Sequence, residues 1–207
     1  MKYSLSLRTY NFLSHKLLLC YSRITTLWTY FIGHIQNVCI GKKCNFIGVM
    51  TFNVFRGGEI IIGNRCVFVS KETSNLLGLN HRCIFSATPA IPSSSCSLII
   101  GNNCGFSGTT IWCFSRIELG NNVRCGANTL IMDGDAHFED SRTSPPRPII
   151  IKDNVFLGAN VVVKKGVTIG ENSVIGMNSV VTHDIPANSV AVGVPCKVIH
   201  QVELYSK

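Results

Sequence analysis

The chain has 207 residues, which predicts one domain, and 46% of them are hydrophobic, enough for a sizeable core. It has no apolar run long enough to predict a membrane span, and its net charge of +8 comes from scattered lysines and arginines, without a basic run or motif that would favour nucleic acid. The ten cysteines include no CxxC pair and no zinc-type spacing, so we expect no metal, no disulfide framework and a reducing cytoplasm.

Residues 1–37 precede the repeats and form an N-terminal cap segment in our interpretation. The stretch 12–35 is apolar but contains Lys16 and Arg23. No small-residue cleavage site follows it, so a signal peptide is not expected. We interpret the segment as amphipathic, with helix as its expected form, and peripheral contact with a membrane surface remains open.

A six-residue cadence begins near residue 38, with an aliphatic residue followed by glycine. Units of this kind open at Ile40, Ile62, Ile100 and Leu119. Cysteine fills the slot four places later at Cys44, Cys66 and Cys104, so these thiols are expected to be small core residues. Residues 71–97, rich in serine and proline, interrupt the cadence.

Between residues 151 and 186 the cadence runs without a slip. Its units read IKDNVF, LGANVV, VKKGVT, IGENSV, IGMNSV and VTHDIP. Neither 3.6 nor 2.0 residues divides this pattern, and a fixed short period is typical of a solenoid. Three units close a triangular turn, so Ile151 should stack on Ile169 and Leu157 on Ile175. Glycine and asparagine at the corners tolerate tight or left-handed backbone.

These observations predict an all-β solenoid domain over residues 38–200, followed by a tail over 201–207. The cadence stops where a unit should open at residue 137 and restarts at Ile151. Residues 137–150 are therefore expected to leave the coil as an extruded loop. Loops of this length are usually functional or disordered.

His137 is the candidate catalytic residue because it stands at this break among acidic residues. Acyl transfer to a hydroxyl needs a base that removes the proton, and a neutral imidazole suits this task. Asp135, or less surely Asp133, would fix the imidazole tautomer. Gly158 is a candidate oxyanion donor through its amide. The alternatives are a surface histidine and a glycine needed only for corner geometry.

Two segments carry a resemblance to a known family. The ending from Val181 to Ile199, VTHDIPANSVAVGVPCKVI, is similar to that of sugar O-acetyltransferases of the galactoside and maltose type. The segment from Met132 to His137, MDGDAH, resembles the Asp-x-Asp-x-His motif of their polysaccharide branch. The chain thus resembles the hexapeptide-repeat acyltransferases over residues 38–200. Their fold is a left-handed parallel β-helix.

The resemblance implies a homotrimer that binds acetyl-CoA as co-substrate in a groove between subunits, with His137 as base. The positions implied to contact the cofactor are Phe156, Ala159, Met177, Thr182, His183, Lys197 and His200. The positions expected on the acceptor side are Ser107, Trp112 and Arg142. Ser107 replaces the asparagine that holds the sugar in galactoside-type enzymes. Core or interface packing is the alternative role of Trp112.

The favoured function is acetyl transfer from acetyl-CoA to a sugar hydroxyl, in capsule or O-antigen biosynthesis. One alternative is acetylation of an amino sugar or of an antibiotic hydroxyl, as in streptogramin acetyltransferases. Another is a metal hydratase of the gamma carbonic anhydrase kind, but the chain lacks the closely spaced histidines that such a site needs. A purely structural solenoid is the third.

Overall fold

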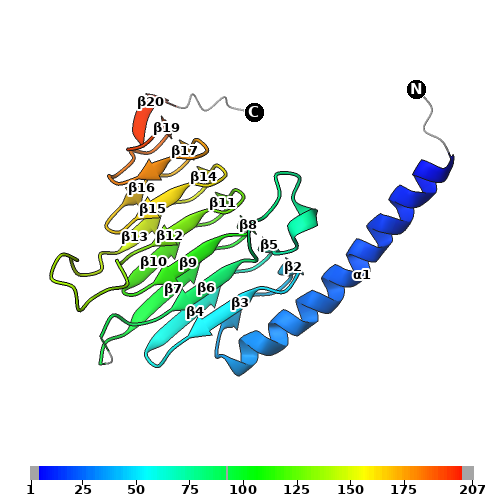
Figure 1. The fold of residues 1–207 in the computed structure, drawn as a ribbon, viewed down its shortest axis with the longest axis horizontal. Coiled ribbons are helices and arrows are strands. Elements are labelled where there is room, and N and C mark those ends of the chain that lie inside the picture. Colours follow the sequence, from blue (N-terminus) through cyan, green and yellow to red (C-terminus); the bar gives the residue numbers. More distant parts are fainter. Residues whose placement is uncertain (1–4, 92, 202–207) are drawn as a thin grey trace.

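The computed structural model describes residues 5–91 and 93–201, and it shows a long helix beneath a stack of short strands (Figure 1). The helix is α1 (Leu5–Ile35). The strands that follow form three sheets, and all neighbouring strands in them are parallel except β19 and β20, the last pair of one sheet, which are antiparallel. The chain visits the three sheets in turn, so the sheets are the faces of a triangular prism.

Face 1 contains β1 (Cys39–Ile40), β4 (Gly58–Ile62), β7 (Cys96–Ile100), β10 (Arg116–Leu119), β13 (Ile149–Ile151) and β16 (Thr168–Ile169). Face 2 contains β2 (Asn45–Ile47), β5 (Val67–Val69), β8 (Gly105–Ser107), β11 (Arg124–Cys125), β14 (Phe156–Leu157), β17 (Val174–Ile175), β19 (Ser189–Val192) and β20 (Lys197–Gln201). Face 3 contains β3 (Thr51–Val54), β6 (Ile84–Ala87), β9 (Thr110–Cys113), β12 (Leu130–Met132), β15 (Val162–Lys164) and β18 (Val180–Val181).

The predicted ladders are confirmed inside the prism. Ile151 pairs with Ile169, and Leu157 pairs with Ile175, in parallel register. All four side chains are at most 1% exposed. Earlier coils use aromatic residues for the same purpose, with the rings of Phe46, Phe68 and Phe106 stacked at centroid distances of 4.6 and 5.1 Å. Stacking of neighbouring coils therefore builds one continuous core.

The cysteines predicted to lie in the core do so as free thiols. Cys44, Cys66 and Cys104 are at most 5% exposed, and each lies against a backbone carbonyl of the next coil at 3.2–3.3 Å. Desolvation contributes to raising the pKa of the Cys125 thiol, which is fully enclosed. All ten cysteines are free.

Asparagine and glycine have different roles at the corners. The corner asparagines, among them Asn154, Asn160, Asn172 and Asn178, adopt left-handed backbone with φ between 57° and 60°. Their side-chain amides also join successive coils, as in the bonds from Asn154 Nδ2 to Asn172 Oδ1 at 2.9 Å and from Asn160 Nδ2 to Asn178 Oδ1 at 3.0 Å. Gly158, Gly170 and Gly176 do not have positive φ, so in these three units asparagine makes the left-handed turn, whereas Lys43, Arg65 and Gly166 make it in other units.

The predicted break at 71–97 is interrupted by a strand. The chain leaves the prism at residues 70–83, which contain the short 3-10 helix η1 (Glu72–Ser74), and again at 88–91 and 93–95. Between these excursions β6 pairs with β3 and β9 on face 3. Strand β6 was not predicted from the sequence, because its residues do not follow the six-residue spacing of the neighbouring units.

Helix α1 packs on the first coil through side chains that carry hydroxyl groups. Thr25 Oγ1 donates to the carbonyl of Phe46 at 2.5 Å, and Tyr30 Oη donates to the carbonyl of Gly41 at 2.6 Å. The part of α1 nearest the N-terminus projects beyond the prism (Figure 1). Over residues 5–91 and 93–201, no helix is both long enough and apolar enough to cross a bilayer.

Candidate active site

A loop over residues 133–148 leaves the prism at the edge where face 3 passes to face 1. It joins β12 to β13. The expected bounds were 137–150, whereas the flanking strands end at Met132 and begin at Ile149. Ile149 is fully buried and pairs with Ile117, so β13 begins two residues before the clean repeat does. Asp133 lies inside the prism, and its contacts define where the loop begins.

The carboxylate of Asp133 holds the turn of the coil below. Its Oδ1 accepts the amide of Phe114 at 2.7 Å, and its Oδ2 accepts the amides of Ser115 and Arg116 at 2.8 Å. Burial raises the pKa of this carboxyl, while the three amides act in the opposite direction. Asp133 is fully buried and does not contact His137, so it serves the fold.

Asp135 is bound to Lys165 and not to His137. The Lys165 ammonium contacts Asp135 Oδ2 and also donates to the carbonyl of Ser144 at 2.7 Å. Its side chain is only 9% exposed. The hydrogen bond from Lys165 lowers the pKa of Asp135. The role expected of Asp135, orienting the base, is therefore not seen in the structure, because a cation from β15's corner binds this carboxylate and tethers both ends of the loop.

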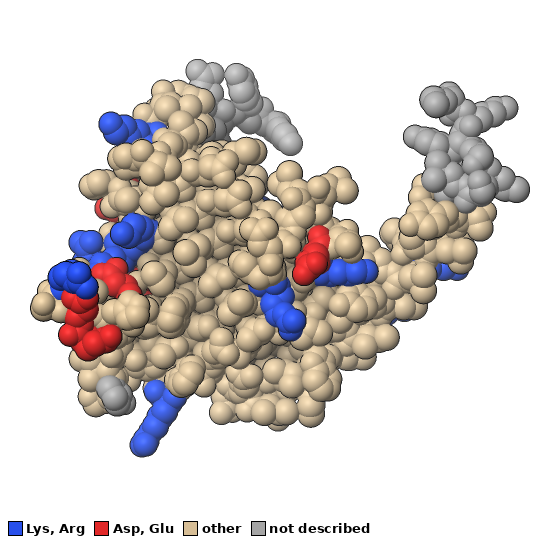
Figure 2. All heavy atoms as spheres, viewed as in Figure 1, with Lys and Arg blue, Asp and Glu red and all other residues tan. Residues whose placement is uncertain are grey.

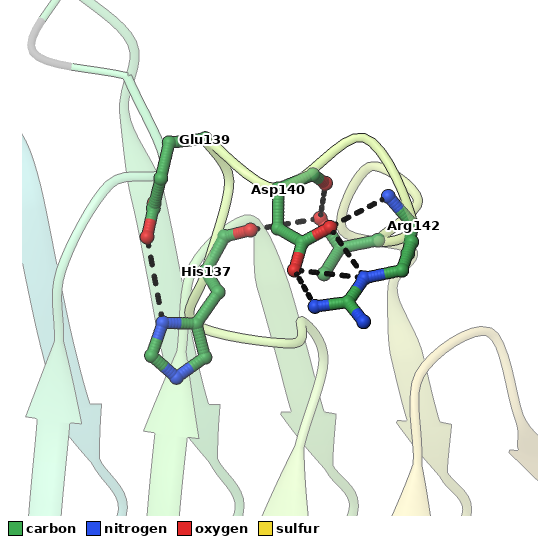
Figure 3. A network of polar contacts seen from close by, with 5 residues as sticks. His137, Glu139, Asp140 and Arg142 are labelled. Carbon is green, nitrogen blue, oxygen red and sulfur yellow. Dashed lines mark hydrogen bonds and ion pairs between the residues drawn. The ribbon is translucent and has the colours of Figure 1, made fainter.

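His137 lies on the outer part of the loop, with a side chain 75% exposed in the single chain (Figure 3). Its Nδ1 stands 3.5 Å from Oε1 of Glu139, the nearest carboxylate. Its backbone is held in a turn, because the His137 carbonyl accepts the amide of Asp140 at 3.1 Å and the hydroxyl of Thr143 at 2.9 Å. The loop thus fixes the backbone of His137 and leaves its imidazole exposed to solvent.

Arg142 is exposed to solvent but is not a free cation. Its guanidinium binds the Asp140 carboxylate through Nε at 3.0 Å and Nη2 at 2.6 Å (Figure 3). This hydrogen bonding lowers the pKa of Asp140 and raises that of Arg142. The expected contact between Arg142 and the acceptor would have to compete with this pair.

Aromatic rings lead from face 3 to the loop. Trp112 on β9 packs against Phe114 with ring centroids 4.7 Å apart, and Phe114 meets Phe138 edge-on at 5.0 Å. Phe114 is buried, whereas Phe138 is 36% exposed beside His137. A hollow of about 370 Å³ adjoins this region and is lined by Ala90, Ile91, Phe138–Ser141 and Thr143–Pro146. Trp112 therefore has a packing role on its Phe114 side and an open side toward solvent.

The predicted cofactor positions fall into two groups in a single chain. Thr182 and His183 hydrogen-bond to each other at 2.8 Å and lie on the same prism edge as His137. The second group lies on face 2 or at the edge between faces 2 and 3, and it comprises Phe156, Ala159, Met177, Lys197 and His200. Met177 is 65% exposed and Phe156 is 46% exposed. Face 3 separates the two groups.

Ser107 and Phe156 line a second hollow, of about 490 Å³, on face 2. It exists because Gly105 lacks a side chain between Val67 and Arg124 in the outward row of the sheet. Arg65 and Arg124 flank it, and Arg65 Nε is bound to Asn103 Oδ1 at 2.7 Å. These arginines were not among the residues predicted from the sequence. A signal was available for Arg124, since the residue before each unit-opening side chain of this face points outward, whereas Arg65 lies at a corner.

The amide of Gly158 is already used by the β-helix. It donates to the carbonyl of Ile175 at 2.8 Å, so it is not free to bind an oxyanion. A Cβ at this position would lie 2.6 Å from the backbone nitrogen of Met177. The catalytic role predicted for Gly158 is therefore corrected to a structural one: the close approach of two coils requires glycine.

Gly158→Ala should destabilise the protein by about 1–3 kcal/mol, the usual cost of forcing extra atoms into a packed site. Gly105→Ala is the matched control, because its Cβ meets only the flexible side chain of Arg124, at 3.0 Å. The control should stay within about 0.5 kcal/mol of the parent. Urea unfolding followed by circular dichroism compares the three proteins, and equal midpoints would contradict the assignment.

Comparisons with known proteins agree with the repeat architecture described above. A family model described as "Hexapeptide repeat of succinyl-transferase" matches residues 148–183. Galactoside O-acetyltransferase from Escherichia coli is 46% identical over 90 residues, which are 42% of this chain and 44% of that enzyme. The chain spans about half the length of the curated relatives that it matches.

Two solved structures share the architecture over most of their length. A mutant of AntD, an N-acyltransferase from Bacillus cereus, in complex with dTDP and coenzyme A, has a TM-score of 0.63 at 18% identity and covers 84% of this chain and 89% of its own. The polySia specific acetyltransferase NeuO has a TM-score of 0.54 at 20% identity, with coverage of 82% and 88%. At these identities the likeness concerns the fold, and the expected left-handed parallel β-helix is confirmed.

Proposed function

We propose that this chain, which belongs to the hexapeptide-repeat acyltransferases, moves an acetyl group from acetyl-CoA to a hydroxyl group of a saccharide, in the biosynthesis of a capsule or O-antigen polysaccharide. The observation that carries the proposal is the 46% identity with a galactoside O-acetyltransferase over 90 residues. The exposed imidazole of His137, held on an ordered loop beside aromatic rings, is consistent with it.

In the proposed reaction the neutral imidazole of His137 takes the proton of the acceptor hydroxyl as its oxygen attacks the thioester carbonyl. The C–S bond then breaks, and the thiolate leaves with the proton returned by the imidazolium. The products are an acetyl ester and the free thiol of coenzyme A. Glu139, and not Asp135, is the carboxylate positioned to hold the Nδ1–H of His137 as it becomes cationic, because it stands 3.5 Å from Nδ1.

We place the site between two copies of the chain in a homotrimer. His137, Thr182 and His183 lie on one edge of the prism, and Phe156, Ala159 and Met177 lie on or next to another, so one copy cannot bring the two groups together. Face 3 lies between these edges, and Lys164 is the only charged residue in its strands. A surface with so little charge is typical of the core of subunit interfaces.

The acetyl donor would bind with its pantetheine arm along the C-terminal coils, near Phe156 and Met177. Lys197 on β20 is the proposed partner of a phosphate, and Arg65 and Arg124 add positive charge on the same face. Trp112 and Phe138 offer ring faces for a sugar. The proposed location is the cytoplasm, where acetyl-CoA is made and where free thiols such as these persist, with peripheral contact at the inner face of the membrane.

The proposal is tested by incubating the purified protein with acetyl-CoA and a panel of neutral sugars, acidic sugars, amino sugars and a streptogramin. Release of free thiol reports turnover, and mass spectrometry of the product separates an ester from an amide. We expect ester formation on a saccharide. Formation of an amide would instead indicate that the acceptor is an amino sugar. Failure to bind acetyl-CoA in calorimetry, together with no thiol release, would refute the activity.

A further inference from the structure

One side of α1 carries an apolar stripe that the prism leaves uncovered. We define the stripe as Tyr10, Leu13, Leu17, Ile24, Leu27 and Phe31, whose residues are 52–73% exposed. The spacing of three, four, seven, three and four places keeps these side chains on one side of a helix. Monomeric soluble proteins rarely expose so much contiguous apolar surface without a partner for it.

The prism is packed against a different side of the same helix. Ser22, Thr25 and Thr29 are 2–6% exposed and face the first coil. At 100° per residue the centre of this buried row lies about 140° around the helix from the centre of the apolar stripe. The stripe therefore points away from the β-helix, along a helix whose outer part stands clear of the prism (Figure 1).

The charge of the chain is concentrated at this end. Residues 1–71 contain nine lysines and arginines and one acidic residue, Glu59, a net charge of +8. Residues 72–207 contain ten basic and ten acidic residues, so their net charge is zero. The helix α1 has no aspartate or glutamate at all. In Figure 2 the projecting helix shows no acidic atoms and is mostly uncharged on the face in view.

The flanking charges distinguish between two possible partners for the stripe. Lys16 and Arg23 lie beside it on the flank turned away from the prism, by their helical spacing. A coiled coil with copies of the same helix would set these cations near one another without an acidic partner. An anionic lipid surface pairs with them instead. Tyr10, Trp28 and Phe31, all exposed, are also of the residue type that favours the boundary between lipid and water.

We propose that α1 lies in the surface of an anionic bilayer, with the apolar stripe in the acyl boundary and Lys16 and Arg23 at the headgroups. The basic first coil then faces the membrane, and the loop bearing His137 stands farther along the prism axis. An enzyme attached in this way would meet a lipid-linked saccharide at the membrane surface. The lipid binding itself does not depend on acetyl transfer.

The test is co-flotation of the full chain with vesicles of phosphatidylethanolamine and phosphatidylglycerol, compared with vesicles of phosphatidylcholine alone. We expect binding to the anionic vesicles, weakened by salt. Leu17→Glu should lower the partition coefficient at least about tenfold, because it removes a buried leucine and adds a repelled charge. Lys16→Gln with Arg23→Gln should lower it about fivefold for each charge removed.

Leu19→Glu is the matched control, because Leu19 is also exposed, at 49%, but lies on the opposite side of α1 from the stripe. It should bind vesicles like the parent. The idea is wrong if Leu17→Glu and Leu19→Glu bind equally, or if binding does not distinguish the two lipid mixtures. It is also wrong if light scattering shows that Leu17→Glu dissociates an oligomer while vesicle binding persists. Each readout is independent of thiol release.

Discussion

His137→Ala should lower the rate of acetyl transfer by about a hundredfold to ten-thousandfold, the range that a positioned general base contributes. Folding should be unaffected, because the side chain is 75% exposed and its contact with Glu139 is a loose one of 3.5 Å. The measurement is kcat from thiol release at saturating acetyl-CoA, combined with the oligomer mass and the Kd for coenzyme A. Both of these should match the parent.

Two carboxylate variants sharpen this experiment. Glu139→Gln should lower kcat, because it removes the carboxylate nearest to Nδ1. Asp135→Asn should act mainly on stability, because Asp135 binds Lys165. The reverse order, with Asp135→Asn damaging kcat and Glu139→Gln harmless, would restore Asp135 as the orienting group. Full activity of His137→Ala would show that His137 is not the general base.

Asp133→Ala should destabilise the protein by about 3 kcal/mol or more, because it leaves the amides of Phe114, Ser115 and Arg116 without an acceptor. Each buried donor left unpaired costs about 1–3 kcal/mol. Urea unfolding followed by circular dichroism provides the measurement. Asp133→Asn should fall between the parent and Asp133→Ala, because one amide oxygen remains to accept.

Asp153→Ala is the matched control for this prediction. Asp153 also accepts a backbone amide of the coil below, that of Asn121 at 2.8 Å, but it does so at an exposed corner. Its loss should cost about 1 kcal/mol, the net value of a typical hydrogen bond. Similar losses for Asp133→Ala and Asp153→Ala would mean that burial adds nothing to the Asp133 contacts.

The fold was readable from the sequence because its period is local. Each unit places an aliphatic residue such as Ile169 and a small residue such as Val167 inside the prism, and both are at most 1% exposed. Only the repeat is needed to deduce that residues 18 apart will stack. The ends of the loop were less readable, since Ile149 belongs to β13 by its pairing with Ile117, a partner 32 positions away.

The candidate site was readable only in part, because its details depend on partners that spacing does not reveal. Asp133 and Asp135 look equivalent in the sequence, yet the first binds three amides inside the prism and the second binds Lys165. The sequence suggests that the Gly158 amide could bind an oxyanion, but in the structure this amide already donates to the carbonyl of Ile175. The position of His137 at a break in the repeat did indicate an exposed loop, because a break frees the chain from the coil.

The excursions at 70–83, at 88–91 and 93–95, and at 133–148 all leave from edges of the prism, and after each of them the strands resume parallel pairing with the coil below. Insertions of different length therefore leave the pairing of the following strands unchanged. A scaffold of this kind can exchange its loops, and with them the molecules it recognises, while the stack that supports them stays constant. Selection for a new acceptor would then act on surface segments whose alteration carries little risk of misfolding.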